Sequence, residues 1–150
     1  TTLKAIRNSF IGHVYGFDSF QGLPEDWREG FETGKFATST VPVVEGSNII
    51  VGWFQDTLPK FLQQNSSPIA FIHFDADLYS STIYCLNQVT KFLAPRSVFI
   101  FDEYWNYPGW EEHEHRAFSE WREQNPQFIV RKIGTVSGGN MEQVAFEILK

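Results

Sequence analysis

The chain has 150 residues, of which 42% are hydrophobic and 17% aromatic, and its formal net charge is -6. This length provides one substantial core and little room for a second, so we expect a single domain over residues 1–150. The negative charge and the scattered lysines and arginines exclude a nucleic-acid backbone as the main partner, and no apolar stretch approaches the roughly 20 residues of a membrane-spanning helix.

Strand and helix patterns alternate from the N-terminus onward. In chain order they predict the end of a helix, a short strand, a turn-rich loop and a second strand, over residues 1–10, 13–17, 19–35 and 48–54. Residues 36–44 fit either an extended stretch or an insertion. Asp56 is a suitable N-cap for a helix that ends near Gln64, with Pro59 tolerated in its first turn.

Two apolar runs, residues 68–74 and 97–101, both end on acidic residues. Without alternating polar residues, such runs suit neighbouring parallel strands that are buried on both faces. The acids that follow them are Asp75, Asp77, Asp102 and Glu103. Ligands bind at the carboxyl edge of open α/β sheets, so these acids are expected to meet in one crevice and to be able to hold a divalent cation.

The remaining segments complete an α/β pattern. Ser80, Ser81 and Thr82 offer N-cap hydroxyls for a helix whose apolar stripe ends before Pro95. That stripe consists of Ile83, Leu86, Val89, Phe92 and Leu93. A further helix is expected over residues 111–124, and residues 127–133 and 143–149 flank Gly138-Gly139-Asn140 as an antiparallel hairpin. The predicted fold is a Rossmann-like, doubly wound, mostly parallel sheet with this hairpin at its C-terminus.

Four motifs resemble those of class I S-adenosylmethionine-dependent methyltransferases, and most closely the macrocin (macrolide sugar) O-methyltransferase-like group. The motifs are Val14-Tyr-Gly-Phe-Asp-Ser-Phe-Gln-Gly-Leu-Pro24, Gly52-Trp-Phe-Gln-Asp-Thr-Leu-Pro59, His73-Phe-Asp-Ala-Asp-Leu-Tyr-Ser-Ser-Thr82 and Phe101-Asp-Glu-Tyr104. They occur in the order of the family and cover most of residues 14–118. The resemblance implies an O-methyltransferase that acts on a small molecule such as a sugar.

The same resemblance implies a cofactor site for S-adenosylmethionine. Asp18 matches the acid that bonds the ribose hydroxyls, and a carboxylate suits a diol because it accepts two hydrogen bonds. Trp53 and Phe54 match positions beside the adenine, with Asp56 nearby. Plain structural roles stay open: Asp18 as a cap of the following loop, and the two aromatic residues as core.

A metal site is also implied, because Asp75, Asp102 and Glu103 match the acids of the metal-dependent members, including the catechol O-methyltransferase group. Oxygen ligands of this kind suit Mg²⁺. The chain departs from the pattern at Glu103, where relatives more often carry Asp or Asn, and at Leu78, where the catechol enzymes carry a lysine base. The alternative is that the acids cap helix N-termini and bind no metal.

The catalytic residues are expected to be Asp75, Asp77 and His113, and the candidates for the general base among them are His113 and Asp77. His113 and His115 cannot share one helix face, so at most one of them points at the site. A charged run at a helix start is commonly a solvated face. His73 is expected to be a hydrogen-bonded core histidine.

Nothing before His13 matches the first strand and glycine-rich loop of the family, which bind the methionine end of the cofactor. We therefore expect the fold to be incomplete at the N-terminus and these residues to be the C-terminal portion of a longer protein.

Two other classes remain open. Asp75-Ala-Asp77 also resembles the Asp-x-Asp metal site of nucleotide-sugar glycosyltransferases, and a methyltransferase-like fold can serve as a non-catalytic module. With no signal-peptide pattern and only one cysteine, Cys85, which suits a buried site, we expect a cytoplasmic protein without membrane contact. The expected partner is a small-molecule acceptor, and a homo-oligomer is left open.

Overall fold

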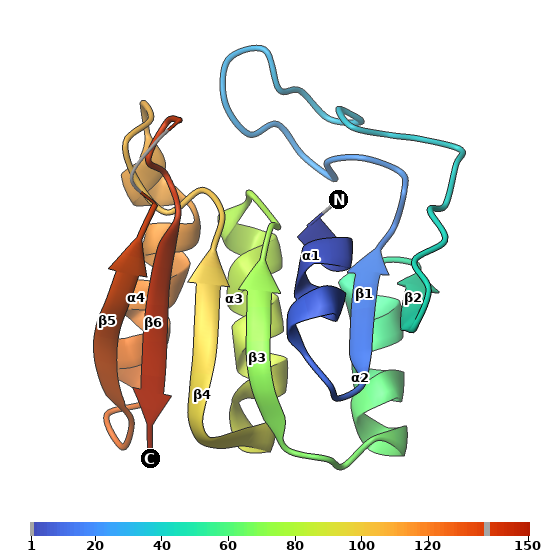
Figure 1. Ribbon diagram of the computed structural model, residues 1–150. Coiled ribbons are helices and arrows are strands. Elements are labelled where there is room, and N and C mark those ends of the chain that lie inside the picture. Colours follow the sequence, from blue (N-terminus) through green and yellow to red (C-terminus); the bar gives the residue numbers. More distant parts are fainter. Residues whose placement is uncertain (1, 137–138) are drawn as a thin grey trace. The chain divides into compact units, whose positions relative to one another are not determined.

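The structure is a computed structural model that describes residues 2–136 and 139–150. Strands and helices alternate, and contacts divide the chain into two compact units, residues 1–61 and 62–150 (Figure 1). The predicted α/β class is confirmed. Within the described residues, every helix is too short or too polar to cross a bilayer. Gly138 of the predicted hairpin turn lies outside the described residues.

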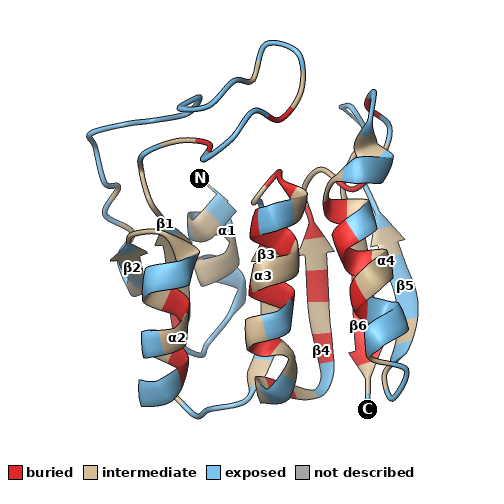
Figure 2. Ribbon diagram, turned by 180° about the vertical axis from the view of Figure 1, so that it is seen from behind, coloured by how far each residue is buried: buried red, intermediate tan, exposed pale blue. Residues whose placement is uncertain are grey.

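The first unit is a small parallel sheet with one helix on each face (Figures 1 and 2). Its elements are α1 (Thr2–Ser9), β1 (Val14–Asp18), β2 (Ser47–Val51) and the first eight residues of α2 (Phe54–Gln64). The rings of Tyr15 and Phe17 lie 4.6 and 5.1 Å from the ring of Phe61 in α2. Gly16 faces the other way, where a Cβ would lie 3.1 Å from a methyl of Leu3 in α1. The alternation of side chains along a strand thus packs both helices against β1.

The junction between β2 and α2 differs from the prediction. The carbonyl of Trp53 accepts hydrogen bonds from the amides of Asp56 at 3.0 Å and Thr57 at 3.1 Å, so the helix is already formed before Asp56. Asp56 therefore lies in the first turn and is not the N-cap. Gly52 makes the junction with φ 141°, and a Cβ there would lie 2.8 Å from the Thr57 side chain, so this position requires glycine.

The loop between β1 and β2 has no helix or strand in residues 19–46. The turn-rich pattern predicted this for residues 19–35, and residues 36–44, which the sequence left open, form no strand either. It is nevertheless ordered by local hydrogen bonds. The Leu23 amide donates to the Lys35 carbonyl at 2.9 Å, and Asp26 accepts bonds from the backbone and side chain of Thr33. Trp27 is buried within this segment.

The second unit is a four-stranded sheet with the order β3-β4-β6-β5. The strands are β3 (Ile69–Phe74), β4 (Leu93–Phe101), β5 (Ile129–Thr135) and β6 (Val144–Leu149). β3 and β4 are parallel, whereas β6 is antiparallel to both β4 and β5. The predicted C-terminal hairpin is confirmed, and it makes this sheet a mixed one.

The helices α3 (Tyr79–Val89) and α4 (Glu114–Gln124) lie on the same face of the sheet (Figure 2). The short helices η1 (Thr90–Phe92) and η2 (Trp110–Glu112) adjoin them. Ring contacts of 4.8 Å join Phe101 to Phe118 and Phe118 to Phe146, and Phe118 stacks on Trp121. Burial alternates along the last five residues of β4, because α3 and α4 cover one of its faces. The residues on the other face are of intermediate burial, so full burial is found on one face of this strand only.

The ends of α3 also differ from the prediction. The helix begins at Tyr79, its N-cap is Leu78, and no side chain makes a capping bond there. The predicted capping hydroxyls of residues 80–82 lie within the helix instead. Leu93, which the helical stripe included, is the first residue of β4, because Pro95 cannot continue a helix and the chain becomes extended before it. Cys85 is buried, and burial raises its pKa to about 12.

Candidate functional site

The loop after β3 holds two acids around a tight turn. Asp77 has φ 58°, and the amide of Leu78 donates to the carbonyl of Ala76 at 2.6 Å. A left-handed conformation is uncommon outside glycine, although Asp tolerates it better than most residues. Asp77 is only 8% exposed. The strained backbone of this loop thus fixes the direction of a buried carboxylate, as is common at functional sites.

The loop after β4 lies beside it at the same edge of the sheet. The amide of Asp102 donates to the carbonyl of Phe74 at 2.9 Å, which extends the parallel pairing beyond the strands. Asp75, Asp77 and Glu103 each offer one carboxylate oxygen, and these three oxygens lie within 4.8 Å of one another. The sequence suggested Asp75, Asp102 and Glu103 as the metal set. The structure brings Asp77 into that group and gives Asp102 other partners.

The pKa of Glu103, a member of this acid cluster, is strongly raised. Burial, followed by the negative charges of Asp77, Glu114, Asp102 and Asp75, raises its pKa to about 10. Its Oε2 is buried and accepts no hydrogen bond from the described residues. Such surroundings favour a bound proton or cation on the carboxylate.

Asp102 is held by polar side chains. Nε2 of His73 lies 3.2 Å from Oδ1 of Asp102, and the amide group of Gln143 donates to the same oxygen. Burial opposes ionisation of Asp102, but the hydrogen bond and charge of His73, with hydrogen bonds from Glu103 and Gln143, outweigh it and lower the pKa of Asp102. His73, 11% exposed, is the hydrogen-bonded histidine that the sequence predicted.

Glu114 is part of this site, although sequence reasoning missed it. It is fully buried, and its two oxygens accept the amides of Ala76 at 3.4 Å and Glu103 at 3.2 Å. Burial raises its pKa well above the usual value, against the effect of these two hydrogen bonds. A helical stripe could have revealed it, because Glu114 shares the 3.6-residue spacing of Ala117, Phe118 and Trp121, all fully buried.

His113 and His115, on either side of Glu114, pack against aromatic rings. The ring of His113 is 6.3 Å from that of Tyr107, and His115 contacts Tyr104 at 5.0 Å and Trp110 at 4.5 Å between ring centres. Burial lowers the pKa of His115. His113 is the N-cap residue of α4 and is not a member of the acid cluster. Its catalytic role stays a prediction.

The residues expected to bind the cofactor lie in the first unit. Oδ1 of Asp18 accepts the amide of Phe20 at 2.8 Å, so Asp18 caps the following loop. The amide of Gly52 donates to the Asp18 carbonyl at 2.9 Å, which joins the end of β1 to the turn before Trp53. Trp53 and Phe54 are half-buried and Asp56 is exposed. The ends of β1 and β2 therefore bring the predicted ribose and adenine residues to one edge of their sheet.

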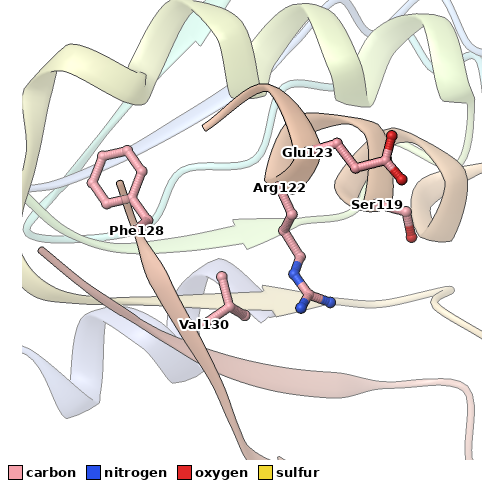
Figure 3. A pocket seen from close by; sticks show the side chains of 5 residues that line it. All are labelled: Ser119, Arg122, Glu123, Phe128 and Val130. Carbon is pink, nitrogen blue, oxygen red and sulfur yellow. The ribbon is translucent and has the colours of Figure 1, made fainter. Parts of the chain in front are cut away.

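A cavity of about 390 Å³ lies between α4 and the strand β5 (Figure 3). It is lined by Ser119, Arg122, Glu123, Phe128 and Val130. None of these residues belongs to the predicted site, and the cavity is open to solvent.

A family model described as a methyltransferase domain matches residues 1–104, which is more than half of the chain. The chain belongs to this methyltransferase family. The family predicted from the four sequence motifs is thereby confirmed. No curated protein sequence matches this methyltransferase significantly.

Solved methyltransferases share its fold. CalS11, a TDP-rhamnose 3'-O-methyltransferase of calicheamicin biosynthesis, is 24% identical with a TM-score of 0.69, and the alignment covers 97% of this chain and 66% of CalS11. The O-methyltransferase NovP is 21% identical with a TM-score of 0.68, and 97% and 64% are covered. An O-methyltransferase from Bacillus cereus in complex with SAH is 13% identical with a TM-score of 0.55, and 99% and 79% are covered. The chain thus spans slightly less than two thirds of the length of CalS11 and NovP.

Proposed function

We propose that this methyltransferase transfers the methyl group of S-adenosylmethionine to a hydroxyl group of a small molecule such as a sugar, with the help of Mg²⁺. The observation that carries this proposal is the acid cluster of Asp75, Asp77 and Glu103, within 4.8 Å, in a chain of the methyltransferase family. The fold similarity to a TDP-rhamnose 3'-O-methyltransferase supports a sugar hydroxyl as the acceptor.

The donor set fits Mg²⁺. All three side chains offer oxygen, the ligand type that Mg²⁺ prefers, and Mg²⁺ in enzymes keeps water and substrate oxygens as its other ligands. The partnerless buried Oε2 of Glu103 supports the fit, because it accepts no hydrogen bond from the described protein. Asp75 and Glu103 would hold the ion. Bound there, Mg²⁺ would lower the pKa of the acceptor hydroxyl.

Asp77 is our candidate for the general base. In the transfer, the acceptor oxygen forms a bond to the methyl carbon while the bond from that carbon to the sulfonium sulfur breaks, and the hydroxyl proton passes to the Asp77 carboxylate. The fixed turn around Asp77 supports this role, because a base must be held within hydrogen-bond reach of the proton. His113, which packs beside Tyr107, is the alternative base.

In the first unit, Asp18 would bind the ribose hydroxyls, Trp53 and Phe54 would flank the adenine, and Asp56 would lie nearby. Oδ1 of Asp18 already accepts one backbone amide, and a carboxylate has further lone pairs for a diol. The half-buried aromatic residues offer faces that suit a purine.

The test is a methyl-transfer assay with labelled S-adenosylmethionine as the donor and either TDP-rhamnose or catechol as the acceptor. Each reaction is run in EDTA, and again after an excess of Mg²⁺ is added. We expect label in the sugar nucleotide, lost with EDTA and restored by Mg²⁺. Transfer that EDTA leaves unchanged would remove the Mg²⁺ part of the proposal. Binding of UDP with Mn²⁺, without binding of S-adenosylhomocysteine, would instead favour the glycosyltransferase class, and binding of neither ligand would favour a non-catalytic module.

Two variants give this assay a matched control. Asp75→Asn removes one acid of the cluster, and Glu45→Gln removes an exposed acid from the loop before β2. We expect Asp75→Asn to raise the Mg²⁺ concentration needed for half-maximal activity and Glu45→Gln to leave it unchanged. An equal effect of both variants would indicate a general charge effect and would count against a specific ion site.

A further inference from the structure

Glu114 joins the two acid loops from the helix side. It is the first residue of α4, and its carboxylate is bidentate: Oε1 accepts the amide of Ala76 and Oε2 accepts the amide of Glu103. Ala76 lies between Asp75 and Asp77, and Glu103 is itself an acid of the cluster. One buried side chain thus touches the backbone of both loops whose carboxylates form the cluster.

The position of Glu114 within the helix argues for a specific role. Residues Ala117, Phe118 and Trp121 occupy the same helical stripe and are fully buried and apolar or aromatic. A carboxyl group at such a position costs more free energy than an apolar side chain would, unless polar partners satisfy it. Both of its partners are amides of the acid loops.

Each loop is held from two sides. On the sheet side, the amide of Asp102 donates to the carbonyl of Phe74 and ties the loop ends together. On the helix side, Glu114 ties the same two loops to α4. The helix is anchored by Phe118 and Trp121, whose rings lie 6.2 and 5.8 Å from that of Phe99 in β4. The spacing between the two loops is therefore fixed relative to α4 and the packed core beneath it.

We propose that Glu114 is a positioning residue that fixes the separation of the Asp75–Asp77 and Asp102–Glu103 loops and thereby sets the spacing of the carboxylates in the acid cluster. The inference rests on the proposed function for the purpose of this spacing, which is cation binding. We call the pair of hydrogen bonds from the Ala76 and Glu103 amides to Glu114 the clamp, and it exists whether or not a cation binds.

The test compares Glu114→Gln with Trp121→Phe. Gln has the same shape, but its carbonyl oxygen can accept only one of the two amides, and its NH₂ group faces the other. Trp121→Phe perturbs the same helix by removing the hydrogen bond from Nε1 to Oγ1 of Thr90, 2.8 Å long, and touches neither loop. Both variants are expected to lower the melting temperature, so stability alone does not decide the outcome.

Three measurements separate a positioning role from a structural one: Mn²⁺ affinity, amide hydrogen exchange and affinity for S-adenosylhomocysteine. We expect Glu114→Gln to weaken Mn²⁺ binding by about tenfold, the size typical of residues that orient metal ligands. Exchange of the Ala76 or Glu103 amide should accelerate in the same variant. Trp121→Phe should change neither, and S-adenosylhomocysteine should bind both variants as it binds the wild type.

Unchanged Mn²⁺ affinity and unchanged exchange of both amides in Glu114→Gln would overturn the inference. It would also be overturned if Trp121→Phe reproduced both changes, because the effects would then come from loss of helix stability. A wild-type protein that binds no Mn²⁺ would contradict the cation site of the proposed function, and amide exchange would then decide alone whether Glu114 holds the loops. Failure of the clamp and failure of the cation site are thus distinguishable.

Discussion

His73 in β3 donates a hydrogen bond from Nε2 to Oδ1 of Asp102, 3.2 Å away at the end of the neighbouring strand β4. The contact joins the two parallel strands through side chains at the point where their backbone pairing ends. Both side chains are largely buried, with 11% and 23% exposure. We predict that His73→Phe lowers the free energy of unfolding at pH 7 by about 1–2 kcal/mol, because Asp102 loses a donor in a partly buried setting.

The pH dependence follows from the sign of the Asp102 shift. Its folded-state pKa is lowered, so its contribution to stability is present above the unfolded value and is lost as the pH falls through the folded value. Urea unfolding should therefore show the penalty of His73→Phe at pH 7 and a smaller one at pH 3. The control is the same substitution in Asp102→Asn. A penalty of equal size in that background would mean that it arises from packing and not from the pair.

A second prediction concerns Glu103. Its folded-state pKa is raised to about 10, so between roughly pH 5 and pH 9 the folded state holds a proton that the unfolded state releases. Stability in the presence of EDTA should then fall as the pH rises, by at most about 1.4 kcal/mol per pH unit for one proton. Glu103→Gln should flatten this decline. Melting temperatures of both proteins across this pH range provide the measurement.

The other acids of the cluster also contribute to the dependence of the melting temperature on pH. Added Mg²⁺ therefore serves as the control, because it should act on the cluster alone. The ion competes with the proton for the carboxylates. Added Mg²⁺ should therefore stabilise the wild type more at pH 9 than at pH 5, and it should stabilise Glu103→Gln less. Parallel pH profiles for the wild type and Glu103→Gln in EDTA would contradict the raised pKa of Glu103.

The sequence predicted most of the fold because local patterns and packing agree there. Runs 68–74 and 97–101 became β3 and β4, and the glycine-rich turn signal between residues 127–133 and 143–149 marked the β5–β6 hairpin. The errors lie at element ends, where local signals compete. Asp56 is a residue type that often caps helices, but the helix begins before it. The chain turns at Gly52, and the Trp53 carbonyl already accepts the first helical hydrogen bonds.

The acid cluster shows why a site is harder to predict than a strand. The strand patterns predicted correctly that the acids at residues 75–77 and 102–103 meet at one edge. Which carboxylates converge depends on backbone conformation, such as the left-handed Asp77. Periodicity does not encode that conformation. Glu114 lies in the charged run Glu111-Glu-His-Glu-His115, and the charge of this run indicates a solvated face. The helical spacing of Glu114 from the apolar residues after it indicates a buried position instead, and Glu114 is buried.

The third prediction tests Asp77 as the base. Asp77→Asn keeps the side chain's shape, and Asn tolerates the left-handed conformation. We expect kcat to fall by about 10²- to 10⁴-fold, the usual contribution of a general base, while S-adenosylhomocysteine affinity stays unchanged. The melting temperature should rise, because one of the clustered negative charges is removed.

Glu45→Gln is the control for this loss of charge, since Glu45 is exposed. It should leave both kcat and the melting temperature unchanged. If Asp77→Asn instead retained most of kcat and raised only the Mg²⁺ concentration required, Asp77 would be a ligand of the ion, and His113→Asn would become the variant to assay as the base.

The last prediction separates the two roles of Asp18. In Asp18→Asn the side-chain oxygen can still accept the Phe20 amide, so the loop should keep its structure. The lost negative charge weakens hydrogen bonds to a ribose diol, and bonds to charged groups contribute about 1.5–3 kcal/mol. S-adenosylhomocysteine should then bind about 10- to 100-fold more weakly, with an unchanged melting temperature. Calorimetric titration gives the affinity, with Asp26→Asn, another loop aspartate, as the matched control. A loss of stability in Asp18→Asn without a loss of affinity would make Asp18 a loop cap alone.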